Sequence, residues 1–190
     1  MSILYESNDS FTTNNSDEDE NNQSLYSNNS IELSIFLILN EIIKKNKNSS
    51  QYKKIVIIQK KQIFSLNKIP KINLLQYLHR IVQYCEIERS TLISALIYLD
   101  RFIQNTNIYL TEFNIHQILV ISIIISYKMN EDIIYTNNFL CEVAGINLKI
   151  FNQLQIEFFK LINYNLCISE KEFTKYKKLL ENYCYKTNCK

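Results

Sequence analysis

The stretch at residues 111–129 reads TEFNIHQILVISIIISYKM, and it decides the fold. Aliphatic residues fill almost every position from Ile115 to Ile125, so the segment has no polar face. A buried β-strand is the competing interpretation, but strands usually run for only about 5 to 6 residues. We therefore predict a helix that begins after a Thr111 cap and is enclosed by other helices.

Four amphipathic segments surround this central helix in the sequence. The first follows Pro70, and the second is predicted to begin at a Ser90 cap. With the central helix counted as the third, the fourth segment runs from about Thr136 to Ala144 and ends at Gly145. The fifth begins after Asn147. The inward stripes of three of them are Leu74, Leu78, Ile81, Val82 and Cys85 in the first, Leu92, Ala95, Leu96, Leu99, Phe102 and Ile103 in the second, and Leu148, Phe151, Leu154, Phe158, Leu161 and Ile162 in the fifth.

The flanking segments differ in composition. Residues 1–30 form a polar tail with the acidic run Asp17-Glu18-Asp19-Glu20, and we expect it to be disordered. A helix is predicted from Ile31, whereas residues 52–64 fit either a short helix or an extended segment. A last helix is expected from Glu170 to Asn182.

The composition limits the possible functions. With one Gly and one Pro in 190 residues, the chain cannot build a glycine-rich phosphate loop. The formal net charge of +2 predicts no nucleic-acid partner and no anionic membrane partner. Residues 118–127 are too short an apolar run to span a bilayer.

Neither the cysteines nor the histidines form a recognisable site. Cys184 and Cys189 are spaced too widely for a zinc knuckle, so we expect no metal and no cofactor. His79 and His116 lack a neighbouring residue that would complete a local nucleophilic triad, so no catalytic residue is expected. The scattered, odd-numbered cysteines favour a reduced intracellular compartment, cytoplasmic or nuclear.

Two motifs resemble the cyclin box. The run ALIYLDRF at residues 95–102 resembles the second box helix, and SYKMNED at 126–132 resembles the end of the third. Phe64, the Ile69-Pro70 pair, YLHRI at 77–81, NIH at 114–116, YTNN at 135–138 and VAGI at 143–146 resemble the P-type, or U-type, single-box cyclins. The resemblance implies an all-α fold with an accessory segment at 31–64, a box of five helices at 65–168, and a C-terminal helix and tail at 169–190.

The resemblance also implies a structural ion pair between Arg80 and Asp100. In cyclins an Arg of the first box helix pairs with an Asp of the second. A guanidinium can satisfy a buried carboxylate through two hydrogen bonds. The alternative is that both residues are surface charges.

Cyclins contact their kinase through the end of the third box helix and through the fifth helix, where they use a Lys and a Glu. Lys128 matches the Lys, whereas Gln155 stands at the Glu position. A glutamine keeps hydrogen-bonding capacity but loses the charge. The implied kinase-binding residues are Lys128, Met129, Glu131, Gln155, Phe159 and Tyr164, although Phe159 and Tyr164 also fit ordinary core positions.

The function implied by the resemblance is that of a non-catalytic subunit which binds and activates a cyclin-dependent serine/threonine protein kinase as a heterodimer. No small-molecule substrate is expected. The alternative is a transcription-factor-like cyclin box that binds DNA or polymerase. The single box and the small net charge weigh against that alternative.

Overall fold

The structure is a computed structural model that describes the backbone of residues 31–188 and the side chains of residues 31–183. The described part is all-helical, as predicted. Its elements are α3 (Ile31–Lys47), α4 (Tyr52–Gln59), α5 (Leu74–Cys85), α6 (Arg89–Asn105), α7 (Ile115–Asn130), α8 (Asn137–Ala144), α9 (Leu148–Leu161) and α10 (Glu170–Asn188). The predicted polar tail lies outside the described residues.

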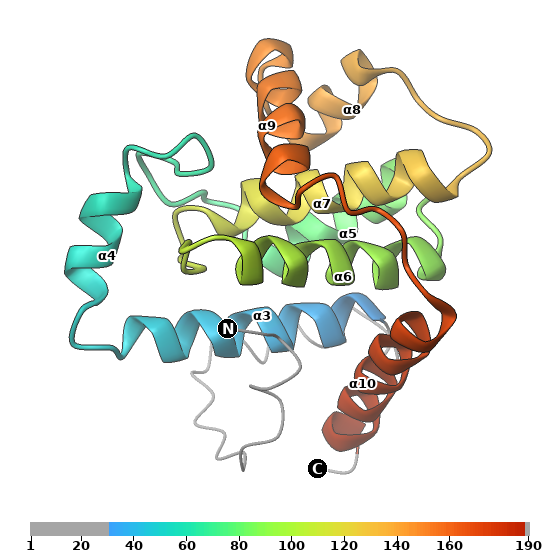
Figure 1. The fold of residues 1–190 in the computed structure, drawn as a ribbon, viewed down its shortest axis with the longest axis horizontal. Helices are drawn as coiled ribbons and strands as arrows, with labels where there is room; N and C mark the ends of the chain where they lie inside the picture. Colours follow the sequence, from blue (N-terminus) through green and yellow to red (C-terminus); the bar gives the residue numbers. More distant parts are fainter. Residues whose placement is uncertain (1–30, 189–190) are drawn as a thin grey trace.

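Helix α7 occupies the middle of the fold. In Figure 1, α6 runs beside it, α3 lies beyond α6, and α9 crosses it from the other side. Every side chain from Ile115 to Tyr127 is buried. The prediction of a helix enclosed by its neighbours is confirmed, and the β-branched residues form no strand there.

Two predicted helix caps are wrong. Helix α7 begins after Asn114, because a turn comes first in which the Thr111 N–H donates to Asn114 Oδ1 at 2.8 Å. Helix α6 begins after Glu88, one residue before the predicted Ser90 cap. The Glu131 carboxylate accepts from the Glu88 N–H at 3.2 Å and from the Thr91 hydroxyl at 2.7 Å, so a distant residue caps α6.

The other helix ends follow the sequence. Gly145 ends α8 in the left-handed conformation with φ 67°, as predicted. Asn147 caps α9, since its Oδ1 accepts from the Lys149 N–H at 3.0 Å. Of the two possibilities for residues 52–64, the helix is the one observed, and α4 has Gln59 as its one buried residue.

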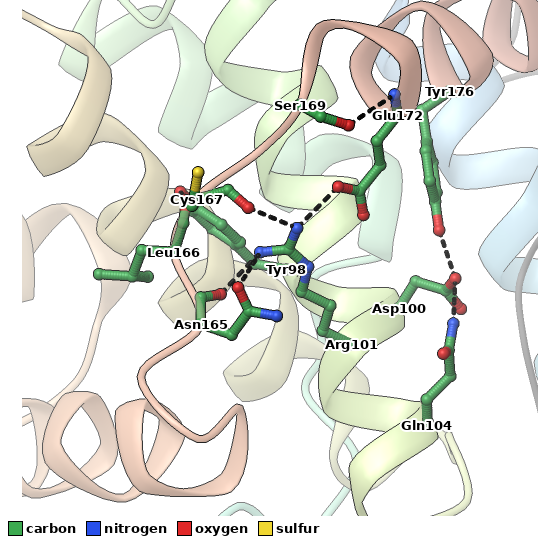
Figure 2. Close-up of polar contacts among 10 residues, drawn as sticks. All are labelled: Tyr98, Asp100, Arg101, Gln104, Asn165, Leu166, Cys167, Ser169, Glu172 and Tyr176. Carbon is green, nitrogen blue, oxygen red and sulfur yellow. Dashed lines mark hydrogen bonds and ion pairs between the residues drawn. The ribbon is translucent and has the colours of Figure 1, made fainter.

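Helix α10 is longer than predicted and packs against α3 and α6. Figure 2 shows how Asp100 of α6 meets it: the Tyr176 hydroxyl donates to this carboxylate, and Gln104 Nε2 donates to it at 2.8 Å. Asp100 is fully buried. Burial, reinforced by the nearby negative charge, raises the pKa of Tyr176, so its hydroxyl remains the donor.

Arg101 fixes the segment that leads into α10. Its guanidinium donates to the carbonyls of Asn165 at 2.7 Å and Cys167 at 2.8 Å, and it pairs with Glu172 at 2.8 Å (Figure 2). The Tyr98 hydroxyl adds a bond to the Leu166 carbonyl at 2.9 Å. Tyr98 and Arg101, which lie three residues apart on α6, therefore hold residues 165–167 and the first turn of α10.

The predicted ion pair between Arg80 and Asp100 is not observed in the described part of the chain. Arg80 is exposed on α5, and its Nη2 donates to the Glu142 carbonyl of α8 at 3.4 Å. Asp100 instead takes hydrogen bonds from α6 and α10. The physical reason is that α10 folds back over α6 and supplies a tyrosine hydroxyl to the buried carboxylate.

The enclosure of α7 predicts a large cost for truncating its side chains. Ile121 is 0% exposed, and Ile121→Ala should lower the free energy of unfolding by about 2 to 5 kcal/mol. Ile133, which follows α7 and is 81% exposed, is the matched control, with an expected change within about 0.5 kcal/mol for Ile133→Ala. Urea denaturation measures both, and equal effects would contradict the buried position of α7.

The Asp100 contacts predict which partner matters for stability. Tyr176→Phe removes one hydrogen bond to a buried carboxylate and should cost about 1 to 3 kcal/mol of unfolding free energy. Arg80→Ala should change it by no more than about 0.5 kcal/mol, because Arg80 is exposed. Thermal and urea denaturation of the two variants measure these losses. A larger loss for Arg80→Ala than for Tyr176→Phe would contradict the observed contacts and support an ion pair between Arg80 and Asp100.

Candidate functional site

Lys128 lies in the last turn of α7, where three helices meet. Its half-buried ammonium donates to Asn137 Oδ1 of α8 at 2.5 Å and to Gln155 Oε1 of α9 at 2.6 Å. Asn137 Nδ2 in turn donates to Asn152 Oδ1 of α9 at 2.8 Å. This network fixes the position of Lys128 relative to α8 and α9.

The environment of the Lys128 ammonium is polar but neutral. Both of its acceptors are amide oxygens, and burial lowers the pKa of Lys128. An ammonium has three N–H donors, and contacts within the described chain use two of them. The third N–H can serve an acceptor on another molecule.

Gln155 stands at the position where the resemblance to cyclins implies a kinase-contacting glutamate. It is 6% exposed, and its Nε2 donates to the Phe151 carbonyl at 3.4 Å while its Oε1 accepts from Lys128. The residue is therefore turned toward α7. Its contact with Lys128 is a hydrogen bond to a neutral amide oxygen.

Phe159 and Tyr164 form an aromatic pair that follows Gln155 in the chain. Phe159 lies one helical turn after Gln155 on α9, so the two share a face. The Phe159 and Tyr164 rings stack with centroids 6.4 Å apart. Phe159 is half-buried against the core, whereas Tyr164 is 66% exposed. The alternative that both residues pack in the core therefore holds in part for Phe159 and does not hold for Tyr164.

Met129 and Glu131, at the end of α7, have different environments. Met129 is 52% exposed and follows Lys128 directly. The Glu131 carboxylate is occupied by the start of α6 through Glu88 and Thr91. Of the predicted kinase-binding residues, the structure joins Lys128 to Gln155 and Phe159 to Tyr164. We call these four residues and Met129 the Lys128 surface, whereas the Glu131 carboxylate has a structural contact.

Two residues of this region were missed by sequence reasoning. Asn137 joins Lys128 to α9, and the sequence marked it only as part of the YTNN motif. Ile156 is 54% exposed beside Gln155. Its position off the inward stripe of α9 was the signal that could have identified it as a surface isoleucine.

The two histidines have structural contacts. His79 Nδ1 lies 2.9 Å from Glu32 Oε2 of α3. His116 Nε2 lies 3.1 Å from the Ile72 carbonyl, and burial lowers the pKa of His116. These contacts tie α5 and α7 to their neighbours.

Among the side chains of residues 31–183, no group of three or more His, Cys, Asp or Glu could hold a metal ion. Cys184 and Cys189 lie beyond the side chains that the structure describes. No helix in the described range is both long and apolar enough to cross a bilayer.

Comparison with known proteins identifies the family. The family model described as Cyclin matches residues 4–166. The PHO85 cyclin-like protein psl1 of Schizosaccharomyces pombe is 36% identical over 120 residues, which cover 62% of this chain and 49% of that protein. Cyclin-U2-2 of Arabidopsis thaliana is 33% identical over 118 residues, covering 62% and 51%, respectively.

A third relative, PHO85 cyclin-7 of Saccharomyces cerevisiae, is 32% identical over 124 residues, covering 59% of this chain and 44% of that protein. Cyclin-P3-1 of Oryza sativa is also similar. The chain spans about half the length of the curated relatives it matches. Because the family model covers most of the sequence and the relatives are PHO85-type, U-type and P-type cyclins, the chain belongs to the cyclin family, in its P/U-type branch.

Proposed function

We propose that this cyclin is the non-catalytic regulatory subunit of a cyclin-dependent serine/threonine protein kinase and forms a heterodimer with it. Family membership supports the proposal, as do the names of two relatives, a PHO85 cyclin-like protein and a PHO85 cyclin. The observation that carries it is the position of Lys128, whose ammonium is held by Asn137 and Gln155 with one N–H left for a partner.

The Lys128 surface has the composition of a protein interface. Exposed Met129 and Tyr164 supply apolar and aromatic area, and both residue types are enriched in interface cores. The ammonium of Lys128 supplies a directional donor for a carbonyl or carboxylate. Because the network fixes the ammonium before binding, little conformational entropy is lost when a partner docks.

The proposed mechanism is a shift of the kinase between two states. An active protein kinase needs the Glu of its regulatory helix paired with the phosphate-binding Lys. A partner that binds the inward position of that helix more tightly than the outward position populates the active state. The Lys128 surface would make these differential contacts, and the chain itself would perform no chemistry.

Reversing the charge of Lys128 tests the proposal. Lys128→Glu should weaken the binding of the kinase that co-purifies with the chain from its native cells by about thirtyfold or more, the scale for breaking a desolvated charged contact. Kinase activity recovered with the chain should fall in parallel, while circular dichroism remains unchanged.

The matched control for Lys128→Glu is Lys177→Glu on α10, which makes the same charge change at an exposed position. It should leave kinase recovery unchanged. Full activity with Lys128→Glu, or the absence of any protein kinase among the proteins that co-purify, would refute the proposed function.

Restoring the charge at position 155 gives a second prediction. Gln155→Glu converts the Lys128 contact into an ion pair and should raise the free energy of unfolding at pH 7 by about 1 kcal/mol, the difference between a charged and a neutral hydrogen bond. Kinase affinity should not rise, because the new carboxylate neutralises the Lys128 ammonium that the partner is proposed to contact.

The pH dependence of the Gln155→Glu effect has a definite sign. The new carboxylate has a lower pKa in the folded state than in the unfolded state, where it is about 4.3. The gain is therefore present above that value and is lost as pH falls through the folded-state pKa. Thermal melts of both proteins from pH 7 to pH 3 measure it, and a gain that persists at pH 3 would contradict an ion pair with Lys128.

A further inference from the structure

The small net charge conceals a strong separation of charge along the chain. Residues 44–71 contain nine lysines and no Asp or Glu, a formal charge of +9. The rest of the sequence holds the other 12 of the 21 Lys and Arg and all 19 Asp and Glu, a formal charge of −7. The two parts together give the net charge of +2.

The structure gathers this basic segment at one end of the molecule. The end of α3, helix α4 and the connection toward α5 form the left side of Figure 1. All nine lysines are exposed: Lys44, Lys45, Lys47, Lys53, Lys54, Lys60, Lys61, Lys68 and Lys71. One of them, Lys47, pairs with Glu112 at 2.9 Å.

The same segment exposes four isoleucines. Ile57 and Ile58 of α4 are 68% and 58% exposed, and Ile63 and Ile69 are 41% and 49% exposed. The core contacts of this region come from other residues: buried Phe64 packs on Phe102 and Phe158, and the Gln59 amide faces the backbone of Tyr109. The isoleucines are therefore not needed to hold α4 in place.

Exposed aliphatic side chains among lysines match the chemistry of an anionic bilayer surface. Lysines near such a surface are attracted by the negative headgroups, and aliphatic side chains gain free energy by entering the acyl boundary. A nucleic acid would use the charge but offers no apolar layer for isoleucines. The segment has no Arg, the residue that most often recognises base edges. Its two aromatic rings, Tyr52 and Phe64, are half-buried and buried, so neither is well placed to stack on a base.

We propose that the surface formed by Lys53, Lys54, Ile57, Ile58, Lys60 and Lys61 binds peripherally to anionic phospholipid membranes. This proposal departs from the expectation drawn from net charge, because a membrane responds to the local charge within about a Debye length and not to the whole-chain sum. Neither signal would suffice alone, since stable membrane attachment usually combines charge with inserted apolar groups.

Vesicle co-sedimentation of the full chain tests the proposal. The chain should bind vesicles of phosphatidylserine and phosphatidylcholine and not vesicles of phosphatidylcholine alone. Binding should weaken as salt is raised, since salt screens exposed charges. Equal recovery with both kinds of vesicle, or with neither, would overturn the proposal.

Two sets of variants separate the charge from the apolar contribution. Replacing Lys53, Lys54, Lys60 and Lys61 together by Gln should weaken binding to the anionic vesicles at least about tenfold. The matched control replaces four exposed lysines of α10 by Gln and should retain most of the binding; these are Lys171, Lys175, Lys177 and Lys178. The pair Ile57→Ser and Ile58→Ser should also weaken binding, with an unchanged melting temperature because both side chains are exposed.

Other occupants of the surface give different outcomes. If the isoleucine variant binds vesicles as well as the wild type does, and duplex DNA competes fully, the surface is a general polyanion site and the proposal fails. If only a variant with Asp17, Glu18, Asp19 and Glu20 replaced by Asn and Gln binds vesicles, the chain's own acidic run occupies the lysines and the proposal also fails. Binding by the wild type that depends on both lysines and isoleucines supports it.

Discussion

The fold depends on the burial of α7 on all its sides. A helix with no polar face is stable in water only when other helices cover it, and each neighbour must then present an apolar stripe. Helices α5, α6 and α9 do so, and they are placed by that requirement. The polar residue that leaves the core at the end of α7, Lys128, is held there by hydrogen bonds to Asn137 and Gln155.

The amides around Lys128 show how a partly buried cation can be kept without a carboxylate. Desolvation disfavours the charged ammonium, and hydrogen bonds to Asn137 and Gln155 offset part of that cost. A glutamate at position 155 would have neutralised the site within the chain. The neutral acceptors leave the positive charge uncompensated, which makes it more attractive to an acidic group or a carbonyl on a partner.

The sequence allowed prediction of features with a local cause. The length of the apolar run predicted α7, and the single glycine predicted the end of α8. The partner of Asp100 could not be predicted in this way, because Tyr176 lies 76 residues away on a helix whose packing direction has no local signal. Likewise, Glu131 caps α6 from 43 residues away, so the Ser90 cap, a local inference, was wrong. The roles of Lys128 and Gln155 in kinase binding remain a prediction.

Whole-chain charge was the least informative of the sequence measures, because it adds charges that the fold separates. In Figure 1 the basic end around α4 lies on the left, whereas α7 ends on the right with Lys128 in its last turn. The two surfaces come from different elements: the basic surface from α4 and the residues that follow it, and the Lys128 surface from α7, α9 and Tyr164. Because neither surface includes residues of the other, the proposed kinase contact and the proposed membrane contact would not compete for the same side chains.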